Sequence, residues 1–89
     1  MTKKQYEALT WAESKFTLAV TQGYVHITRT EFDKVSTVYE EMYGETVTRS
    51  QKACPRCVLR VMQRIGKDYI AYKEKLAKKK EKKDGGEQG

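Results

Sequence analysis

The chain has 89 residues, of which 38% are hydrophobic and 34% are charged, and its formal net charge is +6. A chain of this length forms one small domain at most, because it removes only ~60% of its unfolded surface from water. No apolar run approaches the ~20 residues that cross a bilayer, and the polar first residues lack the apolar segment of a secretion signal. We therefore expect a cytoplasmic protein without membrane contact.

The charge is distributed unevenly along the chain. Residues 1–48 carry five Lys or Arg and seven Asp or Glu, a net charge of −2, whereas residues 49–89 carry thirteen and five, a net charge of +8. This asymmetry indicates an anionic partner for the second half only. The alternative is that a lysine-rich tail only keeps a small protein in solution.

The first predicted helix spans residues 3–22. Thr2 is suited to the N-cap position, and Gly23 to a left-handed residue at the C-terminal end. Large apolar residues, Trp11 and Leu18, widen an apolar face that repeats at steps of three or four residues. That face consists of Tyr6, Leu9, Ala12, Phe16 and Ala19.

The second predicted helix spans residues 29–43 and ends at Gly44. With Thr28 as N-cap, Glu31 falls three residues later and completes a capping box. The same register places Ile27 and Phe32 at the two positions of a hydrophobic staple. The predicted apolar face is formed by Phe32, Val35, Tyr39 and Met42, with Val38 and Tyr43 beside it.

The third predicted helix spans residues 55–83 and follows a polar connector with a short extended piece around Val47. Cys54 is placed near the N-cap and Pro55 at the first helical position, where a missing N–H costs nothing. Gly66 interrupts the pattern; it either permits close packing against another helix or is merely tolerated. The apolar stripe is Cys54, Val58, Val61, Ile65, Tyr69, Tyr72 and Leu76, flanked by Cys57, Met62 and Ile70.

The sequence therefore predicts an all-α fold with one three-helix domain over residues 1–77. The third helix, at ~43 Å, is longer than the first, at ~30 Å, and its last turns extend past the domain. Residues 78–89 are predicted to be a lysine-rich, partly disordered C-terminal tail.

The two cysteines form a single C-P-R-C motif, for which three interpretations stand. Zinc needs four ligands, so Cys54, Cys57 and His26 fall one short unless a carboxylate or a second copy of the chain supplies the fourth. A thiol pair at a helix start suits redox chemistry, but no βαβ pattern surrounds it. We favour the third interpretation, in which both thiols are small core residues. No catalytic constellation is visible, so we expect neither an enzyme nor a cofactor.

Basic residues recur every turn on one side of the third helix. A guanidinium at successive turns suits phosphate oxygens, because each can donate paired hydrogen bonds. Two alternatives stand: the stripe is a solvated helix face, or Glu40, Glu41 and Glu45 of the second helix pair with it. The predicted nucleic-acid-binding residues are Arg56, Arg60, Arg64, Lys67, Lys78, Lys79 and Lys80.

Residues 31–69 resemble small proteins encoded by phages and prophages, notably those of gut Bacteroidetes. The likeness rests on an aromatic helix that ends at Tyr43 and Gly44, a polar connector, a C-x-x-C motif and a basic helix that reaches Tyr69. It covers about half the chain and implies a phage or mobile-element origin. It also implies a DNA-associated or virion-assembly role, in the host cytoplasm or in the virion.

The leading functional hypothesis is a non-enzymatic module that contacts nucleic-acid backbone through its third helix. The alternative is a protein-interaction or virion-assembly component. In that case an apolar surface that includes Met62, Ile70 and Tyr72 would pack on a protein partner or form a homodimer. A thiol-redox or intermolecular zinc site is the third hypothesis.

Overall fold

The computed structural model describes the backbone of residues 1–88 and the side chains of residues 1–78. These residues form five α-helices and one 3-10 helix, with no strand among them, which confirms the predicted all-α class. In chain order the elements are α1 (Lys3–Leu9), η1 (Thr10–Ala12), α2 (Glu13–Gln22), α3 (Arg29–Tyr43), α4 (Arg49–Lys52) and α5 (Pro55–Gln88).

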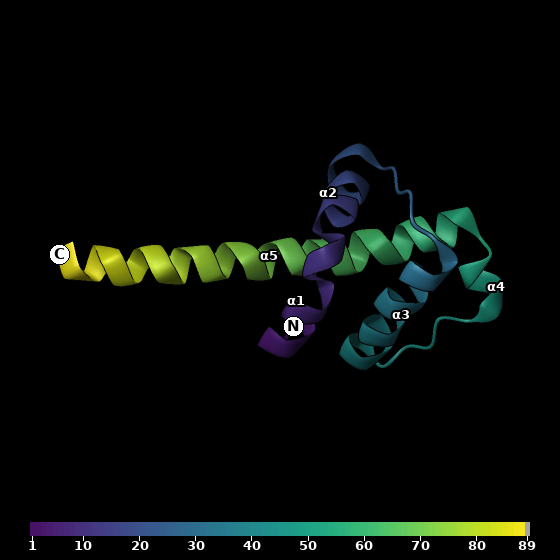
Figure 1. Cartoon of the computed structure of the whole chain (residues 1–89), viewed down its shortest axis with the longest axis horizontal. Coiled ribbons are helices and arrows are strands. Elements are labelled where there is room, and N and C mark those ends of the chain that lie inside the picture. Colours follow the sequence, from purple (N-terminus) through teal and green to yellow (C-terminus); the bar gives the residue numbers. More distant parts are fainter. Residues whose placement is uncertain (89) are drawn as a thin grey trace.

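The long helix α5 is the axis on which the other elements pack. Helix α2 makes the most extensive contact with it, and α1, α3 and α4 add smaller ones. Figure 1 shows these elements gathered around the first half of α5, while its second half extends alone. The molecule is therefore elongated, with principal extents of 53 × 26 × 17 Å.

The C-terminal boundary of α5 differs from the prediction. We expected the helix to end near Lys83, but it continues to Gln88. No proline occurs between these two positions, so every residue keeps the backbone N–H that a helix requires. The predicted disorder of residues 78–89 stays a prediction, because the side chains after Lys78 lie outside the described residues.

The single helix predicted over residues 3–22 is wrong, because η1 separates α1 from α2. Residues Leu9 and Ala12 have ψ values of −1° and 8°, away from α-helical geometry. The indole N–H of Trp11 donates to the carbonyl of Ala8 at 2.9 Å. In a continuous α-helix that carbonyl would accept from the backbone N–H of Ala12. The break turns α2 away from the direction of α1 (Figure 1).

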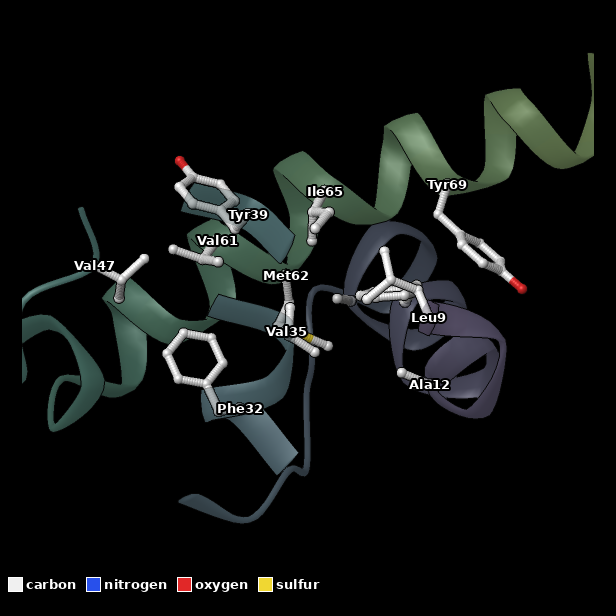
Figure 2. Close-up of a cluster of buried hydrophobic side chains, with 12 residues drawn as sticks. Leu9, Ala12, Phe32, Val35, Tyr39, Val47, Val61, Met62, Ile65 and Tyr69 are labelled. Carbon is white, nitrogen blue, oxygen red and sulfur yellow. The ribbon is translucent and has the colours of Figure 1, made fainter. Parts of the chain in front are cut away.

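The core lies where α2 and α3 meet α5 (Figure 2). Most of the predicted face positions are buried, but three large apolar residues are not: Trp11, Leu18 and Leu76 are 41, 40 and 39% exposed. Conversely, Met62 was predicted only to flank the stripe and is completely buried. The buried apolar residues are Leu9, Ala12, Phe16, Ala19, Phe32, Val35, Tyr39, Val47, Val61, Met62, Ile65 and Tyr69.

The connector before α5 is more ordered than predicted. It contains no extended strand; instead Thr48 caps the short helix α4 and forms a capping box with Gln51. Val47 is buried, and its backbone N–H donates to Glu40 Oε2 at 2.7 Å. A helix of only four residues can form here because its capping box satisfies backbone N–H groups that would otherwise lack a partner.

The other predicted helix ends are confirmed. Thr28 and Glu31 form the predicted capping box, and Thr2 caps α1 with a box of its own. Gly23 and Gly44 have φ values of 64° and 67°, the left-handed geometry that glycine adopts without strain. Helix α5 begins at Pro55, directly after Cys54.

Gly66 lies at the contact between α5 and α2. A Cβ atom placed there would be 3.2 Å from Phe16 Cβ and 3.2 Å from Val20 Cγ2, so the glycine is needed for close packing. Gly66→Leu is expected to lower the free energy of unfolding by about 1–3 kcal/mol, as overpacked cores do. Urea denaturation followed by circular dichroism measures this. Gly66→Ala is the control with a smaller effect, because its helix propensity offsets ~1 kcal/mol.

Candidate nucleic-acid interface

Four of the predicted basic residues share the exposed side of α5. Arg56, Arg60, Lys67 and Lys78 are all exposed, whereas Val61, Ile65 and Tyr69 point to the core on the opposite side. At 1.5 Å per residue this row spans ~33 Å, close to one turn of B-form DNA, ~34 Å. Helix α5 thus brings together charges that are 22 positions apart in sequence, on a straight support.

Arg64 belongs to the same sequence pattern but has a different role. Its guanidinium donates to Glu45 Oε2 at 2.7 Å and to the Tyr39 hydroxyl at 3.0 Å. The guanidinium carbon also lies 4.1 Å from the ring centroid of Tyr43. These contacts tie α5 to the end of α3. Both hydrogen bonds come from Nη1, so Arg64 has partners within the chain, and its contact with phosphate stays a prediction.

An acidic residue beside the basic row is also engaged. Asp68 follows Lys67 in sequence and accepts a hydrogen bond from the hydroxyl of Tyr43. Burial, and then the hydrogen bond to Asp68, raise the pKa of Tyr43, so the phenol stays protonated and keeps donating. Asp68 is consequently directed toward α3 by a specific partner.

Most carboxylates of the acidic first half have partners outside the row. Of the three glutamates raised as alternative partners for the predicted stripe, Glu45 pairs with Arg64, whereas Glu40 and Glu41 contact no described residue of the stripe. Within the part of the chain whose side chains are described, no ion pair engages Arg56, Arg60 or Lys67. The partners are Lys73 and Tyr69 for Glu13, Lys15 for Glu31, Lys52 and Arg29 for Asp33, the Val47 amide for Glu40, and Gln5 for Glu41.

One further exposed cation of α5 was missed in the sequence. Lys75 lies eight residues after Lys67, which at about 100° per residue places it about 80° around the helix, beside the row rather than in it. The predicted residues Lys79 and Lys80 continue α5, and their side chains lie outside the described residues.

The two thiols lie at the start of α5 and are not core residues. Both are free and half-buried, at the edge of the fold rather than in the buried cluster. Cys54 Sγ accepts the backbone N–H of Cys57 at 3.2 Å, which makes this sulfur the cap of α5. The favoured interpretation of the cysteines as core hydrophobes is therefore wrong, because capping draws the Cys54 sulfur to the helix end.

Among the side chains that the structure describes, no further metal ligand is grouped with these two thiols. His26 is exposed in the loop between α2 and α3. Among the described residues, no group of three or more His, Cys, Asp or Glu side chains is arranged to hold a metal ion. A zinc ion shared between two copies stays a prediction.

Comparison of the chain with family models, with curated proteins and with solved structures found no match. Among the described helices, none has both the length and the apolar character that a membrane crossing requires. Function is therefore inferred from the chain's own side chains.

Proposed function

We propose that this protein binds the phosphate backbone of a nucleic-acid duplex through the exposed side of α5. Arg56, Arg60 and Lys67 position the phosphates, Lys78 extends the same row, and Lys75 adds charge beside it. The lysines that follow add sequence-independent attraction. Such a protein is a non-enzymatic module whose affinity depends on charge and shape rather than on base edges.

The observation that carries this proposal is that Arg56, Arg60 and Lys67 have no ion-pair partner among the side chains that the structure describes. Charged stripes on helices are commonly satisfied by carboxylates of the same molecule. Here the acidic first half directs its carboxylates elsewhere, and Arg64 alone of the four predicted Arg and Lys residues from 56 to 67 receives one. Three adjacent cations, Arg56, Arg60 and Lys67, are left facing solvent within the described residues.

A duplex suits this surface better than a single strand does. Proteins that bind single strands without sequence preference stack bases on exposed aromatic side chains. The two aromatic residues of α5 face inward: Tyr69 is buried, and Tyr72 is half-buried with its ring centroid 5.1 Å from that of Tyr6. The exposed side of α5 therefore offers charge without a stacking platform.

Fluorescence anisotropy of a labelled duplex of ~20 base pairs tests the proposal. If ~4 to 6 phosphates are neutralised, log K should fall against log[salt] with a slope of about −4 to −5. Binding at 50 mM salt should therefore weaken by about 300- to 1,000-fold at 200 mM. A single strand of the same length is the matched control and should bind more weakly.

Two outcomes would contradict the proposal. One is no binding to duplex at 50 mM salt, and the other is affinity that does not change with salt. Tighter binding to a single strand than to the duplex would contradict only the preference for a duplex, and the proposed phosphate contacts would remain. A parallel titration with duplex RNA separates the two duplex types, which differ in groove shape.

The protein-interaction hypothesis has less support from the described contacts. Met62, which it placed on a partner-binding surface, is completely buried, and Ile70 and Tyr72 are half-buried against the rest of the chain. Leu76 is the large apolar residue of α5 that stays exposed. A stable dimer in sedimentation without duplex affinity would favour this alternative. The phage or mobile-element origin is compatible with either role and stays a prediction.

A further inference from the structure

The two cysteines of the C-P-R-C motif at the start of α5 take no part in the proposed phosphate contacts, and their geometry is specific. Cys54 occupies the position before Pro55, and its sulfur lies 3.2 Å from the backbone nitrogen of Cys57. Both thiols are half-buried, so a small reagent can reach them at the end of the molecule where α4 and α5 meet (Figure 1). A disulfide between them would join side chains one helical turn apart.

The two thiols have different electrostatic surroundings. Hydrogen bonds from the Cys57 thiol and then from the Cys57 amide lower the pKa of Cys54, and the nearby charge of Arg56 lowers it further. The pKa of Cys57 is raised, chiefly because its thiol donates to the Cys54 sulfur; Arg60 opposes this only in part. Cys54 is thus the better thiolate, and Cys57 is the thiol that holds its proton.

We propose that Cys54 and Cys57 form a dithiol that exchanges with small-molecule disulfides, with Cys54 as the attacking sulfur and Cys57 as the resolving sulfur. The reacting sulfurs are distinct from the basic row proposed to bind phosphate, although Arg56 and Arg60 of that row lie close to them. Its substrate class is a low-molecular-weight disulfide of the glutathione type.

The exchange proceeds in two balanced steps. The Cys54 thiolate attacks one sulfur of the small disulfide, forms a mixed disulfide and expels the first small thiolate. Cys57 then attacks the Cys54 sulfur, expels the second small thiolate and gives that thiolate its proton. The protein dithiol is oxidised to the Cys54–Cys57 disulfide, while the small disulfide is reduced to two thiols.

A shallow hollow of about 250 Å³ lies beside the motif. It is lined by Ala53 and Pro55, the chain neighbours of Cys54 on either side, so part of a small disulfide can rest close to the motif. Lys52 also lines the hollow, and its ammonium nitrogen lies 3.0 Å from Asp33 Oδ1. Apolar surface is supplied by Val25, Ile27 and Val58.

The test uses the reduced full-length chain and oxidised glutathione, without nucleic acid. Aliquots are quenched with an alkylating reagent and weighed by mass spectrometry. The wild-type chain should form one intramolecular disulfide and retain no glutathione. Cys57→Ser should keep one glutathione on Cys54. Cys54→Ser should react with oxidised glutathione at least roughly fivefold more slowly than Cys57→Ser does.

Three results would overturn the proposal: equal rates for the two single variants, a wild-type chain that keeps two glutathiones, or cross-linked chains in place of the internal disulfide. The wild-type result needs no variant, and circular dichroism of both serine variants checks that the helices persist. Because nucleic acid is absent, failure here leaves the phosphate-binding proposal untouched.

Discussion

Reversing the charge of Arg56, Arg60 and Lys67 to glutamate is expected to lower affinity for a duplex by at least ~100-fold at 50 mM salt. Each lost phosphate contact reduces the salt slope by about 0.9, so the slope should shift by about 3. The three new carboxylates also repel the backbone. Helicity should not change, because the described side chains include no ion-pair partner for these three residues. Anisotropy gives the affinity, and circular dichroism gives the helicity.

A matched control separates the local surface from overall charge. Replacing Lys3, Lys4 and Lys34 with glutamate also changes the net charge by −6, from +6 to zero, but away from the exposed side of α5. All three lysines are exposed and engaged in none of the ion pairs among the described side chains. This control should keep most of the affinity. Equal loss in both variants would mean that only net charge matters, and the proposed interface would be wrong.

Arg64 is left out of the reversal for a structural reason. Its bonds to Glu45 and Tyr39, and the ring of Tyr43 beside it, join α5 to α3. Arg64→Glu would place two carboxylates against each other and disturb the fold together with the surface. A loss of binding in that variant could not be assigned to phosphate contact.

The difference between Arg60 and Arg64 shows where sequence reasoning reaches its limit. Both recur at the same four-residue step, and both suit phosphate equally well. Which of them meets Glu45 depends on how α3 crosses α5, and that crossing is set by tertiary packing rather than by local pattern. Pairing of the stripe with acidic residues of the second predicted helix was one of the alternatives from the sequence, but the sequence does not indicate which arginine pairs with Glu45.

Local signals were far more informative. The capping box of Thr28 marks the start of α3, and Gly23 and Gly44 mark the ends of α2 and α3. These boundaries can be predicted because each signal acts on backbone groups within one helical turn. The same signal at Thr48 and Gln51 was present in the sequence and overlooked, so α4 was missed. The break at η1 had no such signal: neither glycine nor proline lies there, and the indole N–H of Trp11 donates to the carbonyl of Ala8.

Phe16→Ala is expected to have the largest effect on stability, a loss of ~3–5 kcal/mol. The side chain is completely buried in α2, directly over Gly66. Its ring centroid lies 5.2 Å from that of Tyr69. A domain of this size has a total stability of only ~4–13 kcal/mol, so the variant could lose most of it. Thermal unfolding by circular dichroism should show a midpoint lowered by ~12 °C or more.

Leu18→Ala is the matched control on the same helix. Leu18 is 40% exposed, so its truncation leaves little cavity and should cost less than about 1 kcal/mol. The sequence placed both residues on one apolar face, and the structure separates them. If the two variants lost equal stability, the packing of α2 on α5 would be wrong. If Phe16→Ala alone loses stability, its affinity for a duplex should fall on warming at the temperature at which it unfolds. The reason is that α2 makes the most extensive contact with α5, the helix that carries the basic row.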